Sequence, residues 1–257
     1  MKTRITVLGS GNSTGVPAAN GDWGRCDPSE PRNRRRRASI LIERGSTVVL
    51  VDAGPDLRAQ MLSAGVTRLD AVVFTHAHAD HSQGIDDLRP FVHYGGTPLP
   101  IYGYPEILEQ IRGRFSYMFG TGKTDYYDKP FLRPIEATPR LSIGDIDLTL
   151  FEQDHVVCRT IGIRTGFFAY STDLKALSEE AFAALAGVKV WVVAGIRYKP
   201  HIAHAHLEQV LGWIERVGPE QAYLTHLNHD MDYRALMASL PSGVEPAYDG
   251  KIIEGYD

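Results

Sequence analysis

The sequence contains little cysteine, no long apolar run and no large excess of either charge. Only Cys26 and Cys158 are present, too few for a disulfide framework, which is typical of a reducing compartment. The longest apolar stretches, such as Val188–Ile196, are far shorter than the ~20 residues of a membrane-spanning helix. The N-terminal run Ile5–Leu8 is also too short for a signal peptide. We therefore expect a cytoplasmic protein that is not embedded in a membrane.

The charge balance argues against a general attraction to nucleic acid or anionic lipid. Lys and Arg total 27 and Asp and Glu total 31, which gives a formal net charge of −4. The local exception is Arg32–Arg37, with five arginines in six residues. Charge runs of this kind are usually solvated, so we favour that interpretation over direct contact with a substrate phosphate. A small molecule is the expected partner.

Length and composition are those of a folded chain with a sizeable core. The 257 residues are 43% hydrophobic and 23% charged, and this length suits one large layered domain. We therefore expect a single domain over residues 1–257. The aromatic-rich segment 113–131 lacks a clear period and is interpreted as an insertion, either a lid or an association surface. Plain core packing is the alternative.

Strand and helix patterns alternate along much of the chain. β-branched and apolar runs predict strands at Ile5–Leu8, Ser39–Ile42, Thr47–Val51, Ala71–Thr75, Ile146–Phe151, Gly162–Tyr170, Val188–Ala194, Gln221–Thr225 and Ile252–Glu254. Apolar residues at helical spacing predict helices at Asp56–Ala64, Leu177–Leu185 and Leu207–Val217. This alternation favours packed sheets with helices on their outer faces over an all-β barrel.

Histidines are concentrated in a few short places, and the densest follows a predicted strand. His76, His78, Asp80 and His81 come directly after Ala71–Thr75. Residues two apart on extended backbone point to the same side, so His76 and His78 can chelate one ion. A turn then brings Asp80 and His81 to a second position close by. Imidazole and carboxylate ligands suit zinc, manganese or iron.

Further ligand-type residues follow other predicted strands. His155 comes after Ile146–Phe151, Asp173 after Gly162–Tyr170, and His226 after Gln221–Thr225. Seven ligands are too many for one four-coordinate ion but suit two ions that share a carboxylate. Asp173 is the natural bridging group, because it is the acidic candidate at its own strand end.

These residues resemble the signature of the metallo-β-lactamase superfamily. His76, His78, Asp80 and His81 match its His-x-His-x-Asp-His motif, and the later ligands follow in the expected order. The resemblance implies an αβ/βα sandwich of two mixed sheets with a dinuclear site at one edge. It assigns His76, His78 and His155 to one metal and Asp80, His81 and His226 to the other, with Asp173 bridging. Asp52, in Val51-Asp52-Ala53-Gly54, would orient the site.

Three further stretches are similar to the PhnP-like and tRNase Z branch of this superfamily. They are Gly9–Pro17, Pro31–Ser39 and the motif His204–Gln209. By resemblance, His204 would act as the general acid, while His206 and His201 are the alternatives. PhnP-like proteins often carry a cysteine cluster that binds a structural zinc, but this chain keeps only Cys26 there. A third metal near Cys26 and His229 is therefore left open.

The resemblance implies a cytoplasmic, homodimeric hydrolase that uses two divalent metal ions, zinc or manganese, with iron also possible. We expect a phosphodiesterase that cleaves a small, cyclic phosphodiester by attack of a metal-bridging hydroxide, with Asp80 and His204 as catalytic residues. One alternative is an acyl hydrolase of the same fold, a thioesterase or lactonase. The other is a non-catalytic protein of a cofactor pathway, similar to PqqB.

Overall fold

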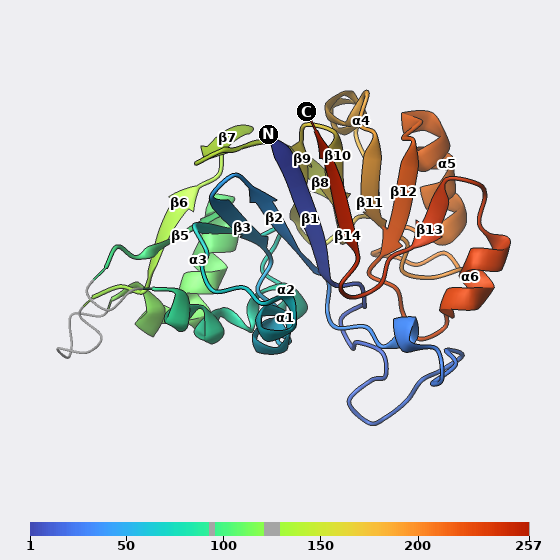
Figure 1. Ribbon diagram of the computed structural model, residues 1–257, viewed down its shortest axis with the longest axis horizontal. Helices are drawn as coiled ribbons and strands as arrows, with labels where there is room; N and C mark the ends of the chain where they lie inside the picture. Colours follow the sequence, from blue (N-terminus) through green and yellow to red (C-terminus); the bar gives the residue numbers. More distant parts are fainter. Residues whose placement is uncertain (93–95, 121–128, 257) are drawn as a thin grey trace.

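Two seven-stranded sheets form the frame of the molecule (Figure 1). The computed structural model describes residues 1–92, 96–120 and 129–256. The first sheet has the order β14-β1-β2-β3-β4-β5-β6, with bounds β1 Lys2–Gly9, β2 Ser39–Arg44, β3 Thr47–Val51, β4 Ala71–Val73, β5 Leu99–Gly103, β6 Leu132–Glu136 and β14 Ile252–Tyr256. The second has the order β13-β12-β11-β10-β9-β8-β7, with bounds β7 Arg140–Ile143, β8 Ile146–Asp154, β9 Arg159–Thr165, β10 Phe168–Ser171, β11 Val190–Ala194, β12 Gln221–Thr225 and β13 Val244–Pro246.

Helices flank the two sheets. The α-helices of the described residues are α1 Leu57–Ala64, α2 Ala79–Ser82, α3 Pro105–Arg114, α4 Glu179–Leu185, α5 Leu207–Val217 and α6 Tyr233–Ser239. Short 3-10 segments occupy Pro31–Asn33, Ile85–Phe91 and Ser116–Phe119. Helix α1 ends at Gly65 and α5 at Gly218, whose left-handed backbone (φ 66° and 65°) closes each last turn. The predicted layered sandwich is confirmed.

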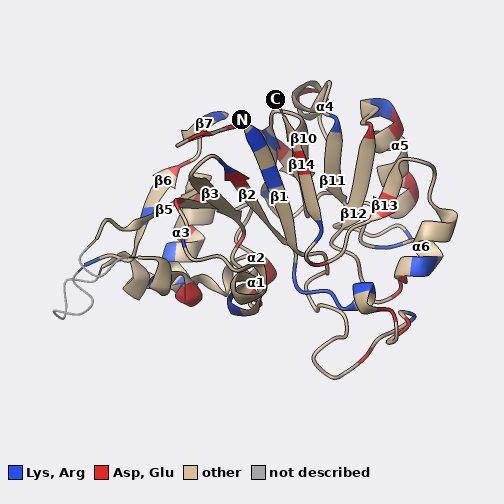
Figure 2. Ribbon diagram, viewed as in Figure 1, with Lys and Arg blue, Asp and Glu red and all other residues tan. Residues whose placement is uncertain are grey.

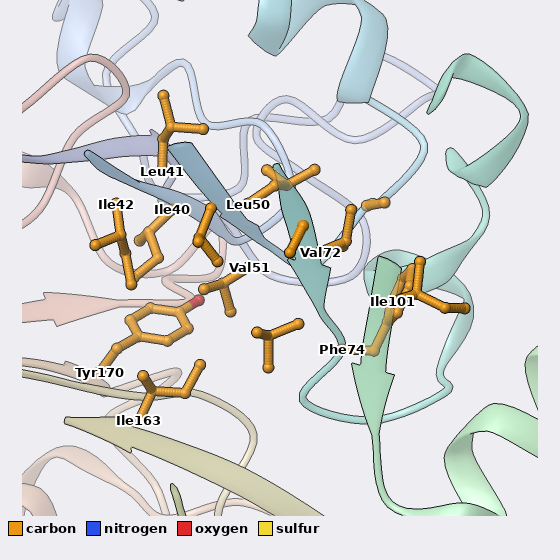
Figure 3. Close-up of a cluster of buried hydrophobic side chains, with 14 of the residues drawn as sticks. Ile40, Leu41, Ile42, Leu50, Val51, Val72, Phe74, Ile101, Ile163 and Tyr170 are labelled. Atoms are coloured by element: carbon orange, nitrogen blue, oxygen red, sulfur yellow. The ribbon is translucent and has the colours of Figure 1, made fainter. Parts of the chain in front are cut away.

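The main core lies between the sheets. Figure 3 shows Ile40, Ile42 and Val51 of the first sheet with their side chains facing Ile163 and Tyr170 of the second. All five are fully buried, and each large apolar side chain of this kind stabilises the fold by about 2 kcal/mol. A second cluster packs the other face of the second sheet against its helices and includes Trp191, Val210 and Leu236.

Strand direction brings the ends of the central strands to one region. Strands β3 and β4 are parallel, as are β10, β11 and β12. Strand β8 is antiparallel to β9, and β9 is antiparallel to β10, so β8 and β10 run in the same direction. The carboxyl ends of these strands therefore meet at one edge of the sandwich, where α2 also lies (Figure 1).

One predicted strand corresponds to two strands in the structure. The predicted single strand Gly162–Tyr170 is wrong: β9 and β10 form an antiparallel hairpin around Gly166, which has φ 48°. Apolar residues continue through the turn, since Phe167 is buried, so hydrophobicity alone did not reveal the reversal. By contrast, β12 and α5 have the predicted bounds.

The aromatic segment 113–131 is described only in part, because residues 121–128 lie outside the described chain. Within the described part, Phe115, Tyr117, Phe119 and Phe131 pack against the main core, and Met118 is fully buried. The lid or association surface remains a prediction, as does the assignment of residues 1–257 to one domain.

Charged residues are distributed over the molecule. Figure 2 shows acidic and basic residues interspersed on the helices and outer strands. Within the Arg32–Arg37 run, Arg35 is buried and donates to the carbonyl oxygens of Asn228 and Met231. Arg32 lies over the ring of Tyr233, with 4.8 Å between guanidinium carbon and ring centroid. In the described residues, no helix has the length and apolar character required to span a bilayer.

Candidate metal centre

The structure brings all seven predicted ligands together. His76 and His78 follow β4, Asp80 and His81 lie in α2, and His155, Asp173 and His226 follow β8, β10 and β12. Their ligand atoms form two groups, each with atoms within 4.8 Å of one another: His76, His78 and His155, and Asp80, His81, Asp173 and His226. The strand ends and helix α2 together build the site at one edge of the sandwich.

The first group consists of three imidazoles. The ring centroids of His76 and His78 lie 4.6 Å apart, and those of His78 and His155 lie 5.2 Å apart. His76 and His155 are buried, whereas His78 is more exposed. Three neutral imidazoles that converge from two loops are a typical ligand set for a zinc-like ion.

The second group joins two imidazoles to two carboxylates. His81 Nε2 lies 2.6 Å from Asp173 Oδ2, and His226 Nε2 lies 3.2 Å from the same oxygen. Asp80 Oδ2 lies 3.4 Å from His226 Nε2. The His81 and His226 rings are stacked, with centroids 5.6 Å apart.

Asp173 lies between the two groups. Its Oδ2 is 3.5 Å from His76 Nε2 in the first group as well as 2.6 Å from His81 Nε2 in the second. A carboxylate in this position can reach an ion on either side, which is the placement that a bridging ligand needs.

Hydrogen bonds orient three of the imidazoles toward the site. His81 Nδ1 lies 2.7 Å from Asp52 Oδ2, and His155 Nδ1 donates to the carbonyl oxygen of Ala203 at 2.9 Å. His76 Nδ1 lies 3.0 Å from Thr75 Oγ1, which donates to Asp52 at 2.8 Å. With Nδ1 engaged in this way, each ring turns its Nε2 lone pair toward the centre.

The residues present fit a pair of divalent cations. The Nε2 atoms of His76, His81 and His226 and Oδ2 of Asp173 are buried, and none has a hydrogen-bond partner in the described structure. The three nitrogens nevertheless lie within 3.5 Å of that oxygen. Buried polar atoms that converge without pairing are arranged as ligands of a cation rather than as partners of one another.

The electrostatics of the site also favour positive charge. Burial opposes protonation of His81, but the carboxylates of Asp80, Asp52 and Asp173 outweigh it and hold the pKa of His81 well above its usual range. Burial likewise opposes protonation of His226, yet Asp173 and Asp80 raise its pKa to about 9. Burial lowers the pKa of His76 well below its usual range, with His81 adding to the shift. Divalent ions would supply the charge that the three carboxylates attract.

Backbone strain is concentrated at this site. The non-glycine residues with positive φ in the described chain are Asp52 (63°), Val156 (67°), Asp173 (44°) and His226 (56°). Three of them are predicted site residues, and the fourth follows His155 directly. L-residues avoid this conformation unless the surrounding structure imposes it, and such strain clusters at functional sites.

His204 is the histidine of the 201–206 segment that reaches the centre. Its Nδ1 lies 3.3 Å from Asp173 Oδ1, and its ligand atoms group with those of His155 and Asp173. Burial lowers the pKa of His204 to about 4, although Asp173 acts in the opposite direction. His201 Nδ1 instead accepts from the backbone nitrogen of Ala203 at 3.2 Å, and His206 occupies the N-cap position of α5 without a side-chain capping hydrogen bond.

Lys175 is a residue near the site that sequence analysis did not identify. Its Nζ donates to the carbonyl oxygen of His201 at 2.7 Å and reaches that of His204 at 3.5 Å. Lys175 therefore ties the loop of His204 to the strand end that carries Asp173. A lone lysine two residues after an aspartate has no motif that could have predicted this contact.

Cys26 and His229 do not belong to the ligand groups of the candidate metal centre. Cys26 is buried with its Sγ 3.8 Å from Arg35 Nη1, and burial raises the pKa of its thiol. His229 packs against Gly24, where a Cβ would meet the imidazole at 2.1 Å. Among the described residues, neither belongs to a group of three or more metal-binding side chains.

The chain is similar to a known protein family and to a solved structure. A family model described as "Beta-lactamase superfamily domain" matches residues 47–227, a stretch that contains all seven predicted ligands. Among solved structures, a "new diphosphatase from the PhnP family" superposes with a TM-score of 0.92 at 30% identity, covering 99% of this chain and 98% of that one.

Curated relatives match over only part of their own length. An octanoyltransferase of Porphyromonas gingivalis is 34% identical over 253 residues, which are 96% of this chain and 50% of that protein. A ribonuclease Z of Bradyrhizobium sp. is 27% identical over 115 residues, which are 43% of this chain and 36% of that protein. The chain thus spans half the length, or less, of these two proteins.

Proposed function

This chain belongs to the β-lactamase superfamily, in its PhnP-like branch, and from that premise we propose that it is a two-metal phosphodiesterase acting on a small, cyclic phosphodiester. The observation that carries the proposal is the position of His204, an imidazole that borders the candidate metal centre from a loop of its own. The diphosphatase similarity and the ribonuclease Z similarity both support phosphorus-oxygen bond chemistry.

The proposal assigns the seven ligands as the sequence predicted. His76, His78 and His155 would hold one cation, Asp80, His81 and His226 the other, and Asp173 would bridge. Bound divalent cations would make water a stronger nucleophile and offset the charge of the phosphate oxygens. Zinc or manganese suits this ligand set, and iron is compatible with it. Asp52 keeps the lone pair of His81 directed at the site.

His204 would donate the proton that the leaving group needs. In the reaction, a water that has given up one proton to solvent bonds through its oxygen to phosphorus, and the bond from phosphorus to the leaving oxygen breaks. That oxygen takes the proton of His204, which regains a proton from solvent after the product has formed. Burial lowers the pKa of His204 to about 4 even with Asp173 beside it, so a further anion next to the imidazole would favour its protonated form. Binding of the phosphodiester anion would therefore prepare the proton donor.

A second candidate is hydrolysis of an acyl compound such as a thioester or lactone. The similarity to an octanoyltransferase over nearly the whole of this chain favours it. A thiolate leaves with less need for a proton than an alkoxide does, so His204 would matter less in this reaction. Dependence on His204 is thus what separates the two candidates.

The test uses purified protein loaded with manganese or zinc, with a chelator control. Two substrates are compared: bis(p-nitrophenyl) phosphate, which has a good leaving group, and a cyclic ribosyl phosphodiester, which has a poor one. We expect metal-dependent turnover of both. His204→Gln should lose about 10²- to 10⁴-fold on the cyclic substrate but little on the nitrophenyl one.

His206→Gln is the matched control, because His206 lies on the same segment outside the predicted ligand groups. It should retain activity on both substrates. Protein with two bound metals but no phosphodiester turnover would overturn the proposal, and cleavage of a thioester that is unaffected by His204→Gln would establish the acyl candidate. Metal analysis that finds one ion or none would favour a non-catalytic, PqqB-like role. A homodimer, proposed by resemblance, is checked by sedimentation.

A further inference from the structure

Three exposed apolar side chains lie within two residues of His155 or His204 in the sequence. Val156 and Val157 follow His155 directly, and Ile202 lies between His201 and His204 in sequence. Their exposed fractions are 53%, 70% and 79%, so the protein itself leaves most of their surface uncovered. We call these three residues the apolar rim.

The apolar rim is continuous with the site. The loop of Val156 and the loop of Ile202 are joined by the hydrogen bond from His155 Nδ1 to the carbonyl oxygen of Ala203, at 2.9 Å. The rings of His155 and His204 lie 4.7 Å apart between centroids. A group that binds beside His204 is therefore close to the two loops that carry the apolar rim.

The backbone at Val156 is held in an unfavourable conformation. Its φ of 67° is a genuine outlier for a β-branched residue, for which glycine or asparagine would be less strained. The Val156 nitrogen donates to Asp154 Oδ1 at 2.7 Å, and the Val157 nitrogen donates to the carbonyl oxygen of His155. The turn thus presents two valines outward, where they contribute little to the core and are free to contact a ligand.

We propose that the apolar rim binds the leaving group of the substrate, which would be an apolar alcohol or phenol. The inference rests on the proposed phosphodiesterase function and extends its substrates from cyclic phosphodiesters to acyclic ones that carry an apolar leaving group. His204 lies on the same loop as Ile202, and the leaving oxygen must be within reach of His204 to receive its proton. The carbon chain attached to that oxygen is then directed over Val156, Val157 and Ile202. The bond from phosphorus to this oxygen breaks, and the alcohol departs with the proton of His204.

The test is a series of methyl 4-alkylphenyl phosphates with methyl, ethyl, propyl and butyl substituents. A para-alkyl group hardly changes the acidity of the phenol, so chemical reactivity stays constant while the apolar surface grows. Release of the phenol by the metal-loaded protein gives kcat/KM. Each methylene that is buried against the rim should raise kcat/KM about two- to fourfold, the upper figure corresponding to full burial.

A second measurement does not depend on turnover. Phosphonate analogues with carbon in place of the scissile oxygen cannot be cleaved, and calorimetry gives their dissociation constants. The dissociation constants should decrease with alkyl length by the same factor per methylene as kcat/KM increases. In Val157→Ser and Ile202→Ser, each added methylene should increase the affinity by a smaller factor, close to 1. Ile252→Ser is the matched control, because Ile252 is 48% exposed on β14, in the first sheet.

The outcomes separate the two proposals. If turnover and binding are both independent of alkyl length, the proposed role of the apolar rim is wrong, while the proposed phosphodiesterase function is unaffected. Length-dependent binding with no cleavage of any phosphodiester would overturn the proposed reaction but keep the apolar contact. An equal loss of length dependence in Ile252→Ser would show a nonspecific effect and would also overturn the rim.

Discussion

His81 Nδ1 lies 2.7 Å from Asp52 Oδ2, and both side chains are fully buried. Asp52 also accepts from the backbone nitrogen and the hydroxyl of Thr75. Burial raises the pKa of Asp52, an effect that the charge of His81 opposes. The carboxylate therefore joins the ends of β3 and β4 and sets the orientation of a predicted metal ligand at the same time.

Asp52→Asn should weaken metal binding while the fold persists. The amide keeps the shape of the carboxylate but removes the charge that holds His81 in place, so metal affinity should fall about 10- to 100-fold. Competition with a chromophoric chelator measures this, and circular dichroism checks the fold. Asp70→Asn, at an exposed ion pair with Arg68, is the control and should bind metal normally. Unchanged affinity in Asp52→Asn would refute the orienting role.

Lys175→Met should impair the proton donor without removing the metals. Loss of the bond to the His201 carbonyl oxygen frees the loop of His204, so kcat on the cyclic phosphodiester should fall about tenfold while KM changes little. Activity on bis(p-nitrophenyl) phosphate should stay near that of the wild type. Lys175→Arg should restore part of the loss. Equal losses on both substrates would point to a general structural defect instead.

Gly84→Ala should disturb the end of α2, the helix that carries Asp80 and His81. A Cβ at Gly84 would lie 1.9 Å from the carbonyl oxygen of Gly54, which is backbone and cannot move aside freely. We expect a loss of about 1 to 3 kcal/mol in the free energy of unfolding and a lower metal content. Gly212→Ala, on the exposed face of α5 with nothing near its Cβ position, should be neutral or stabilising. Urea unfolding compares the two.

Asp249 should make the protein less stable as pH rises. Burial raises the pKa of its carboxyl from 3.8 to about 6, although Arg36 and Ser10 donate backbone hydrogen bonds to it. The folded state therefore holds this proton more tightly than the unfolded state does. Its contribution is fully present below pH 3.8 and is lost as pH rises to about 6, by up to about 3 kcal/mol.

The measurement compares Asp249→Asn with wild type by urea unfolding across that pH range. Asparagine does not ionise, so the stability of the variant relative to wild type should improve with rising pH. A difference that stays constant with pH would contradict the raised pKa. The lost acceptor for the Arg36 nitrogen adds a cost that does not depend on pH.

The positions of the seven candidate ligands could be predicted because each residue follows a strand pattern in the sequence. His226 comes directly after the β12 run, and His155 and Asp173 come within two residues of the ends of β8 and β10. Strand periodicity and residue type therefore suffice to place them at one edge. Asp52 was different, since an aspartate after a strand is common in turns, and only the family resemblance singled it out.

Other features depend on the path of the chain in space. Lys175 acts through a carbonyl oxygen 26 residues away, and the sequence carries no record of that contact. The apolar rim could not be predicted either, because Val156 and Val157 resemble a continuation of the preceding strand in the sequence. Only the structure shows that the backbone at Val156 has φ 67°. The hairpin at Gly166 was missed because apolar residues on both sides conceal the turn.

Strands β1 and β14 pair in antiparallel register, from Lys2 opposite Tyr256 to Thr6 opposite Ile252. The start of β1 and the end of β14 lie at the edge of the sandwich away from the candidate metal centre, side by side in Figure 1. A pulling force applied between residues 2 and 256 would load the interstrand hydrogen bonds one after another, as in opening a zipper. The protein should therefore be mechanically soft along this direction, and β14 would peel away before the load reached the clustered histidines.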